Sequence, residues 1–326
     1  MESSTAQAVG FTEFLKGRFY RDLLSELLGT MLLVFVSCAL SAHWDGEHYS
    51  VTLISLAAGI CIATIVQCLA NASGSHINPV ISIAFAIAGH ITPVRALCYG
   101  ISQCVGATLA VVFCRALTPP SLIGPYYAVN RLNPLLTPAQ GVGMEAVCTF
   151  FLTFTVFATV DKSRSDLEGS GPLAIGFSVL LSHTFGFKYT GAAMNPARSL
   201  GPAIIANKWE HHWVYWIGPL IGSLVAVLLY EYVIAGDASI NKLKSGIYCD
   251  PSYTMKPPPS TVSLKSDKDD PKRIRRPSLM AHFENEHYAD MKRANDVYYT
   301  PGKEPPEDYV KQERFQVISD IGSLHI

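Results

Sequence analysis

Charged residues are scarce over most of this sequence. The chain of 326 residues carries 51 formal charges, and residues 250–326 hold 25 of them, which leaves only 26 for the first 249 residues. With 49% hydrophobic residues overall, that first part is too apolar for an ordinary soluble protein. The net charge of −1 also argues against nucleic acid as a partner.

The apolar part also lacks the groupings that enzymes and metal sites need. It contains no nucleophile–base pair and no metal-spaced cluster, so we expect neither catalysis nor a bound cofactor or metal. Seven of the eight cysteines lie inside apolar runs, which favours packing thiols over a disulfide framework. The chain is polar to about Asp22, so no cleaved signal peptide is evident.

Six long apolar runs fill the first part of the chain. They cover residues 23–42, 51–71, 94–117, 139–160, 172–187 and 213–236. Each is long enough, or nearly so, to cross a hydrocarbon core about 30 Å thick, which takes ~20 helical residues. We therefore expect an all-α, multi-pass membrane protein in the plasma membrane. Residues 23–236 form the membrane domain, after a cytoplasmic segment at 1–22 and before a tail at 237–326.

Two Asn-Pro pairs, Asn78-Pro79 and Asn195-Pro196, follow the second and fifth runs. Asn is a strong N-cap and proline fits the first helical position, so each pair predicts a helix start. Both short helices would begin at membrane depth, where non-helical backbone is tolerated only if it is buried in protein or lines a wet cavity. Two such half-helices indicate a pore.

The chain is an internal duplication. Glu26-x-x-x-Thr30 matches Glu145-x-x-x-Thr149, and this pair and the other matching pairs all lie at offsets of 116 to 119 residues. The repeats cover about 23–117 and 139–236, each with three spans and one half-helix. Because three crossings reverse the direction of the chain, the second repeat must be inverted, and the half-helices enter from opposite faces.

Lys and Arg are nearly absent from two of the loops. Residues 43–50 contain neither, and residues 118–138 contain only Arg131, whereas Lys and Arg precede the first span and follow the fourth and sixth. The positive-inside rule therefore puts both termini in the cytoplasm.

The tail from about residue 237 has the composition of a largely disordered segment. Within it, Arg275-Arg-Pro-Ser278 predicts a phosphorylation site for a basophilic kinase, with a solvated basic patch as the alternative. The last residues, 324–326, fit a PDZ-type partner by strand addition.

The motifs as a set resemble the aquaporins, the major intrinsic protein family, and among them the orthodox water channels of animals. The resemblance covers about residues 20–236 and includes Ser-Gly-x-His-x-Asn-Pro at 73–79 and Thr-Gly-x-x-x-Asn-Pro-Ala-Arg-Ser at 190–199. It implies six transmembrane helices with two re-entrant half-helices, a homotetramer, and passive water transport that excludes protons and ions. The bilayer, water and small neutral solutes are the implied partners.

The two half-helix starts would form the centre of the pore, namely Asn78, Pro79, Val80, Asn195, Pro196 and Ala197. Each helix N-terminus brings roughly half a positive charge, and each Asn can offer its amide N–H₂ to a passing water. The preceding residues, 74–76 and 191–193, should be extended and present carbonyls to the water file: Gly74, Ser75, His76, Gly191, Ala192 and Ala193. We expect Glu26 and Glu145 to hold these loops, with a proton relay as the alternative.

The resemblance places the narrowest point at Ala58, His183, Ala192 and Arg198. Arg198 would supply positive charge, and His183 a donor and bulk. Ala58 stands where water-specific members usually carry Phe, and Val80 where the family usually has Ala. We expect water as the main permeant, with passage of glycerol, urea or hydrogen peroxide through the widened filter as the alternative.

Two functions of other classes stay open at this point. A secondary transporter on inverted repeats would need coupling groups near the midplane, for which only the two carboxylates are candidates. A junctional scaffold protein using the tail would show no permeability.

Overall fold

The computed structural model of the chain describes residues 9–42, 44, 49–161, 164, 169–236 and 238. The regular structure in these residues is entirely helical, which confirms the all-α fold class. Residues 239–326, with Ser278 and the final three residues, lie outside the described residues, as does the start of the chain up to residue 8.

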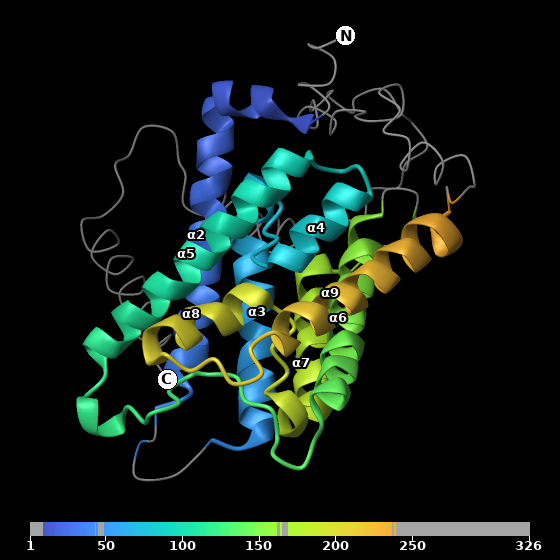
Figure 1. Cartoon of the computed structure of the whole chain (residues 1–326). Coiled ribbons are helices and arrows are strands. Elements are labelled where there is room, and N and C mark those ends of the chain that lie inside the picture. The colour runs from blue at the N-terminus through green and yellow to red at the C-terminus, as the bar shows by residue number, and fades with distance from the viewer. Residues whose placement is uncertain are drawn as a thin grey trace, which may run out of the picture. The chain divides into compact units, whose positions relative to one another are not determined.

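The first repeat consists of α2 (Gly17–Ala39), α3 (Val51–Ser73), the half-helix α4 (Pro79–Ile87) and α5 (Pro93–Leu117), preceded by the short 3₁₀ helix η1 (Phe11–Leu15). The second consists of α6 (Pro138–Val160), α7 (Gly171–Thr190), the half-helix α8 (Pro196–Ala206) and α9 (Val214–Leu229), which continues as the π-helical turn η4 (Tyr230–Ile234). A 3₁₀ turn, η3 (Pro120–Leu122), lies between them. Each predicted run is helical, and both half-helices are present (Figure 1).

Helix α2 begins six residues earlier than the apolar run that predicted it, at Gly17 instead of residue 23. The extra turns contain Asp22, which is buried at 2% exposure. Its Oδ2 accepts a hydrogen bond from Arg95 on α5 at 2.7 Å. Paired charges of this kind are tolerated inside a helix bundle, so hydropathy alone places the helix start too late.

Five helices are long and apolar enough to cross a membrane by length and composition: α2, α3, α5, α6 and the continuous α9–η4. Helix α7 is not among them. Its 20 residues reach about 30 Å at 1.5 Å per residue, but they include serines, His183 and Lys188. It is the counterpart of α3 in the duplication, and the two helices pack together at the centre of the molecule.

Glycines set how closely the long helices approach. The position that a Cβ on Gly106 of α5 would take is filled by the carbonyl oxygen of Leu27 on α2, and the same holds for Gly222 of α9 and Ala146 on α6. On α3, a Cβ on Gly59 would lie 2.8 Å from the carbonyl oxygen of Gly176 on α7. Small residues let membrane helices meet backbone to backbone, and here they do so at equivalent places in both repeats.

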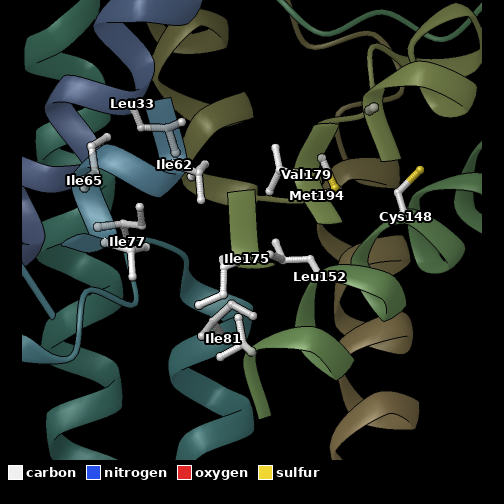
Figure 2. Packing of buried hydrophobic residues seen from close by; sticks show 13 residues of the cluster. Leu33, Ile62, Ile65, Ile77, Ile81, Cys148, Leu152, Ile175, Val179 and Met194 are labelled. Atoms are coloured by element: carbon white, nitrogen blue, oxygen red, sulfur yellow. The ribbon is translucent and has the colours of Figure 1, made fainter. Parts of the chain in front are cut away.

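The main apolar cluster draws on both repeats. Figure 2 shows Leu33, Ile62 and Ile77 of the first repeat with Leu152, Val179 and Met194 of the second. These six form three pairs at offsets of 119, 117 and 117 residues. The duplicated chain therefore builds its central apolar wall from equivalent positions.

Candidate functional site

The starts of the two half-helices meet at the centre of the membrane domain. Asn78 caps α4 by accepting from the Val80 N–H at 3.2 Å, and Asn195 caps α8 by accepting from the Ala197 N–H at 3.0 Å. These helix starts are Asn-capped with proline at the first position, as the sequence predicts.

Each capping amide also donates across to the opposite repeat. Asn78 Nδ2 donates to the carbonyl of Met194 at 2.8 Å, and Asn195 Nδ2 donates to the carbonyl of Ile77 at 2.7 Å. An amide N–H₂ has two donors, so this exchange uses one and leaves one on each Asn. Each Asn can therefore offer a passing molecule a single N–H.

The loops before the half-helices contradict the prediction of extended backbone at 74–76 and 191–193. Gly74, Ser75 and Ile77 have φ values of 93°, 51° and 46°, in the left-handed region. The equivalent residues of the second repeat, Gly191, Ala192 and Met194, have φ values of 82°, 46° and 52°. An ordinary residue between two left-handed ones, as His76 is between Ser75 and Ile77, lets successive N–H groups converge in a nest that binds an anion.

The anion in each nest is a carboxylate from the first helix of the repeat. Glu26 Oε1 and Oε2 accept from the N–H groups of His76 and Ile77 at 2.9 and 2.6 Å. In the second repeat, Glu145 accepts from the N–H groups of Ala193 and Met194 at 2.9 and 2.8 Å. The carboxylates lie about 50 residues from the loops they hold, which is why local sequence patterns predicted the wrong backbone.

The direction of the loop carbonyls follows from these contacts. In a planar trans peptide the C=O points opposite to the N–H that it shares a plane with. Since the N–H groups of residues 76 and 77 point at Glu26, the carbonyls of Ser75 and His76 point away from it. By the same reasoning, the carbonyls of Ala192 and Ala193 point away from Glu145. In each loop, two successive carbonyls therefore point to the same side, away from the carboxylate. In an extended strand, successive carbonyls would point to opposite sides.

A cavity of about 210 Å³ runs along this central region. Its wall on α7 extends from Gly171 to His183, a separation of 12 residues or about 18 Å. Most of the wall is apolar, and the polar groups are few. Of the predicted site residues, the cavity is lined by Ala58, Gly74, Ser75, His76, Asn78, His183, Ala193, Asn195 and Arg198.

Six of the residues predicted for the pore centre, the filter and the loop carbonyls do not line the cavity: Pro79, Val80, Gly191, Ala192, Pro196 and Ala197. They are packed behind it instead. Ala192 belongs to the central apolar cluster and is fully buried. Val80 is also buried, and its carbonyl accepts from Ser223 Oγ on α9 at 3.0 Å.

Arg198 is held by the connection between the two repeats. Its Nη1 donates to the carbonyl of Ala128 at 2.7 Å and to Asn130 Oδ1 at 2.8 Å. Asn130 Oδ1 also accepts from Ser199 Oγ at 2.9 Å. Arg198 Nε and Nη2 make no hydrogen bond within the described residues, so they remain available to a ligand.

Sequence reasoning missed Ala128 and Asn130. They lie in an irregular segment without periodicity, and Ala128 has a left-handed φ of 60°. The one local signal was that Asn130 is followed by Arg131, the only Lys or Arg of the loop, which says nothing about Arg198.

His183 differs from the prediction in its hydrogen-bonding role. Its Nδ1 lies 3.0 Å from the carbonyl oxygen of Val179. A carbonyl can only accept, so Nδ1 carries the proton, and Nε2 of a neutral ring is an acceptor. We expected a donor at this position. In this geometry Arg198 supplies the donors and His183 supplies an acceptor and bulk.

The polar constellation occurs at one end of the cavity only. Ala58, His183 and Arg198 have their equivalents, at an offset of 117 residues, in Ile175, Val66 and Ile81. All six line the cavity. The second repeat thus supplies a histidine and an arginine where the first supplies two aliphatic side chains, so the two ends of the cavity differ in polarity.

The family model for the major intrinsic proteins matches residues 13–230. The chain belongs to the major intrinsic protein family. Among its relatives in this family, aquaporin-4 of Rattus norvegicus is 41% identical over 228 residues, which is 69% of this chain and 70% of that protein. Aquaporin-4 of Homo sapiens is also 41% identical over 228 residues. Aquaporin-2 of Bos taurus is 44% identical over 216 residues, 66% of this chain and 79% of that protein.

A solved structure has a similar fold. The aquaglyceroporin from Plasmodium falciparum superposes with a TM-score of 0.61, covering 66% of this chain and 97% of that one, at 23% identity. This likeness supports the arrangement of helices and says nothing about the permeant. As in other major intrinsic proteins, the described part of this chain is a multi-pass membrane channel fold.

Proposed function

We propose that this chain forms a passive, single-file water channel driven by osmotic gradients. The observation that carries the proposal is the reciprocal bonding of Asn78 and Asn195 to the backbone of the opposite repeat, beside a cavity that both residues line. It agrees with family membership and with the similarity to aquaporin-4 and aquaporin-2.

The mechanism follows from the groups at the centre. A water molecule between the two Asn amides accepts one N–H from each, so it must donate to its neighbours in opposite directions. The proton wire is interrupted there, and the positive ends of α4 and α8 repel H₃O⁺ and metal cations. Carbonyls of the two loops accept from the waters on either side, and apolar walls offer little to bind.

The filter we propose consists of Ala58, His183 and Arg198, the three of the four predicted filter residues that line the cavity. Arg198 donates and His183 Nε2 accepts, so a water can satisfy both at once. The positive charge of Arg198 also opposes the entry of cations.

A second candidate is passage of small neutral solutes such as glycerol, urea or hydrogen peroxide. The observation that favours it is Ala58, a small side chain on the cavity wall beside the polar filter. Without an aromatic ring there, a molecule wider than water meets less steric resistance.

The carboxylates argue against a secondary transporter. Glu26 accepts four hydrogen bonds, two of them from loop N–H groups and the others from Ser73 Oγ and Gln103 Nε2. Glu145 accepts three. Both are fully buried and neither lines the cavity, so they are occupied in holding loops and out of reach of a transported ion.

The remaining features of the proposal come from the sequence. We propose a plasma-membrane location with both termini cytoplasmic, a homotetramer, and a channel domain at 23–236 followed by a tail. In the tail, a kinase acts on Ser278 and a PDZ-type partner binds residues 324–326. No enzymatic activity is proposed.

Stopped-flow light scattering on proteoliposomes of the full chain tests the function. A sucrose gradient should give shrinkage far faster than in protein-free vesicles, with an activation energy close to that of free water diffusion. Shrinkage no faster than in empty vesicles would contradict the proposal. Flux that depends on an imposed ion gradient would favour the transporter.

A further inference from the structure

Two carboxylates enclose Arg95 of α5 at the end of the membrane domain where α2 begins, which is the inner end in the proposed orientation. Arg95 Nη2 donates to Glu13 of η1 at 2.6 Å, and Nη1 donates to Asp22 of α2 at 2.7 Å. The side chains of Arg95, Glu13 and Asp22 are only 16%, 9% and 3% exposed. Ion pairs that are largely shielded from water are screened little by salt. This cluster therefore ties the segment before α2 firmly to α5.

The cluster continues to Tyr99, one turn further along α5. Arg95 Nη1 also donates to the Tyr99 hydroxyl at 3.1 Å, and this hydroxyl donates to the carbonyl of Ser73 at 3.0 Å. The guanidinium lies over the rings of Phe19 and Tyr99, 5.3 and 5.7 Å from their centroids. Arg95 therefore holds Tyr99 in two ways, through the hydroxyl and through the ring.

The fully buried ring of Tyr99 lies against His76, whose side chain lines the channel cavity. The two ring centroids are 5.3 Å apart in an edge-to-face arrangement. The imidazole also packs on Phe85, with centroids 4.3 Å apart, and its Nδ1 lies 3.2 Å from Ser82 Oγ. Three neighbours thus confine a side chain that faces the proposed water path.

The second repeat shows what is particular to this arrangement. The Tyr215 hydroxyl donates to the carbonyl of Thr190 at 3.1 Å, which is the equivalent of the bond from Tyr99 to Ser73. Three residues of the first repeat have unlike equivalents at offsets of 116 to 119 residues: His76, Arg95 and Asp22 correspond to Ala193, His211 and Gly141. The tyrosine is therefore common to both repeats, whereas the arginine and its acid stand at these positions only in the repeat that has an imidazole to hold.

We propose that Glu13, Arg95 and Tyr99 are positioning residues that hold the His76 imidazole against the wall at the inner end of the water path. The carboxylate fixes the guanidinium, the guanidinium fixes the phenol, and the phenol confines the imidazole. This inference rests on the proposed channel function. When the arrangement is weakened, the imidazole swings into the lumen, and a path of single-file width then conducts water more slowly.

Glu13 can be changed with little disturbance to the fold. Glu13→Gln keeps the size of the side chain and one acceptor oxygen but removes the charge. Hydrogen bonds to charged groups are stronger than neutral ones, so the loss of the charge should shift the equilibrium of the imidazole about tenfold toward the lumen. Tyr99→Phe is the second variant, because it keeps the ring and removes the hydroxyl that Arg95 binds.

The test measures how fast diethylpyrocarbonate modifies His76 in the full-length protein, with the modified histidines located by mass spectrometry. Glu13→Gln and Tyr99→Phe should each make His76 react about tenfold faster than in the wild type. His211, before α9 at the other end of the membrane domain, is the internal reference and should react at the wild-type rate. Arg18→Gln removes a charge from an exposed position near the start of α2 and should change neither rate.

A second readout is the water permeability per channel in proteoliposomes. Glu13→Gln and Tyr99→Phe should conduct less water than the wild type, with a higher activation energy, because the water file must displace the imidazole. Gly222→Ala separates positioning from stability, since it weakens the packing of α6 and α9 and touches none of these residues. It should lower the unfolding temperature and leave the His76 rate unchanged.

The readouts separate this proposal from the channel itself. An unchanged His76 rate in Glu13→Gln and Tyr99→Phe, with or without a loss of stability, would overturn the positioning role and leave the water channel standing. A faster His76 rate with unchanged water permeability would overturn the step from the imidazole to the water path. A faster His76 rate in a protein whose wild type conducts no water would contradict the channel and not the positioning.

Discussion

The guanidinium of Arg198 is held in place by residues far away in the sequence. One nitrogen, Nη1, is bound to Ala128 and Asn130 about 70 residues upstream. This fixes the guanidinium on the cavity wall while its other N–H groups stay free for water. Because the guanidinium has five donors in a rigid fork, anchoring one end orients the rest.

Replacing Arg198 removes the fixed charge of the filter. We predict that Arg198→Val raises proton or cation conductance in oocytes above the wild-type background, because the barrier that positive charge provides is lost. Arg115→Val is the control, since Arg115 is an exposed residue of α5 outside the channel cavity. Equal conductance in wild type and Arg198→Val would contradict the role given to this residue.

Ala58 lines the cavity, and we propose that its small side chain sets the width of the filter. We predict that Ala58→Phe suppresses glycerol and urea entry while sparing water, because an aromatic ring restores a wall that the wild type lacks. The measurement is solute re-entry in stopped-flow light scattering. Leu56→Phe, which adds a ring to an exposed position of the same helix, should change neither flux. Unchanged glycerol entry in Ala58→Phe would mean that this position is not at the constriction.

At the scale of helices, the contacts between α6 and α9 depend on the absence of a side chain at Gly222. A Cβ there would overlap the carbonyl of Ala146. We predict that Gly222→Ala destabilises the protein by about 1–3 kcal/mol, the usual cost of overpacking. Gly143→Ala on α6 is the control, because a Cβ at Gly143 meets nothing within 4 Å and alanine is the better helix former. Thermal unfolding in detergent measures both; equal stability of the two variants would refute the packing argument.

The helices and half-helices could be predicted because their signals are local. Asn-Pro pairs mark two helix starts, and runs of apolar residues mark the long helices. The loop backbone could not be predicted, because its left-handed conformation depends on hydrogen bonds to Glu26 and Glu145, which lie on other helices. Asn130 was missed for a similar reason: its partner Arg198 is 68 residues away, and no pattern in the intervening sequence connects them.

The donor role expected of His183 was wrong for the same reason, because it depends on a contact that the sequence does not show. Sequence resemblance gave the residue and its place, but which nitrogen carries the proton depends on the carbonyl of Val179 one turn earlier. The roles of donor and acceptor in a filter are therefore set by the geometry of each helix.

For the whole molecule, duplication explains both the symmetry and its breaking. Equivalent carboxylates hold equivalent loops, equivalent asparagines bond across the centre, and equivalent glycines bring the long helices together. The exceptions are the pairs Val66/His183 and Ile81/Arg198, where one repeat is apolar and the other polar. We propose that the polar side chains of the second repeat select what enters the channel.

The central claim is that water crosses in single file between Asn78 and Asn195. The most direct measurement is the ratio of osmotic to diffusional water permeability of the full chain in proteoliposomes, after subtraction of the protein-free vesicles. Molecules that cannot pass one another move together under an osmotic gradient but exchange slowly, so the account predicts a ratio well above unity. A ratio of unity would contradict it.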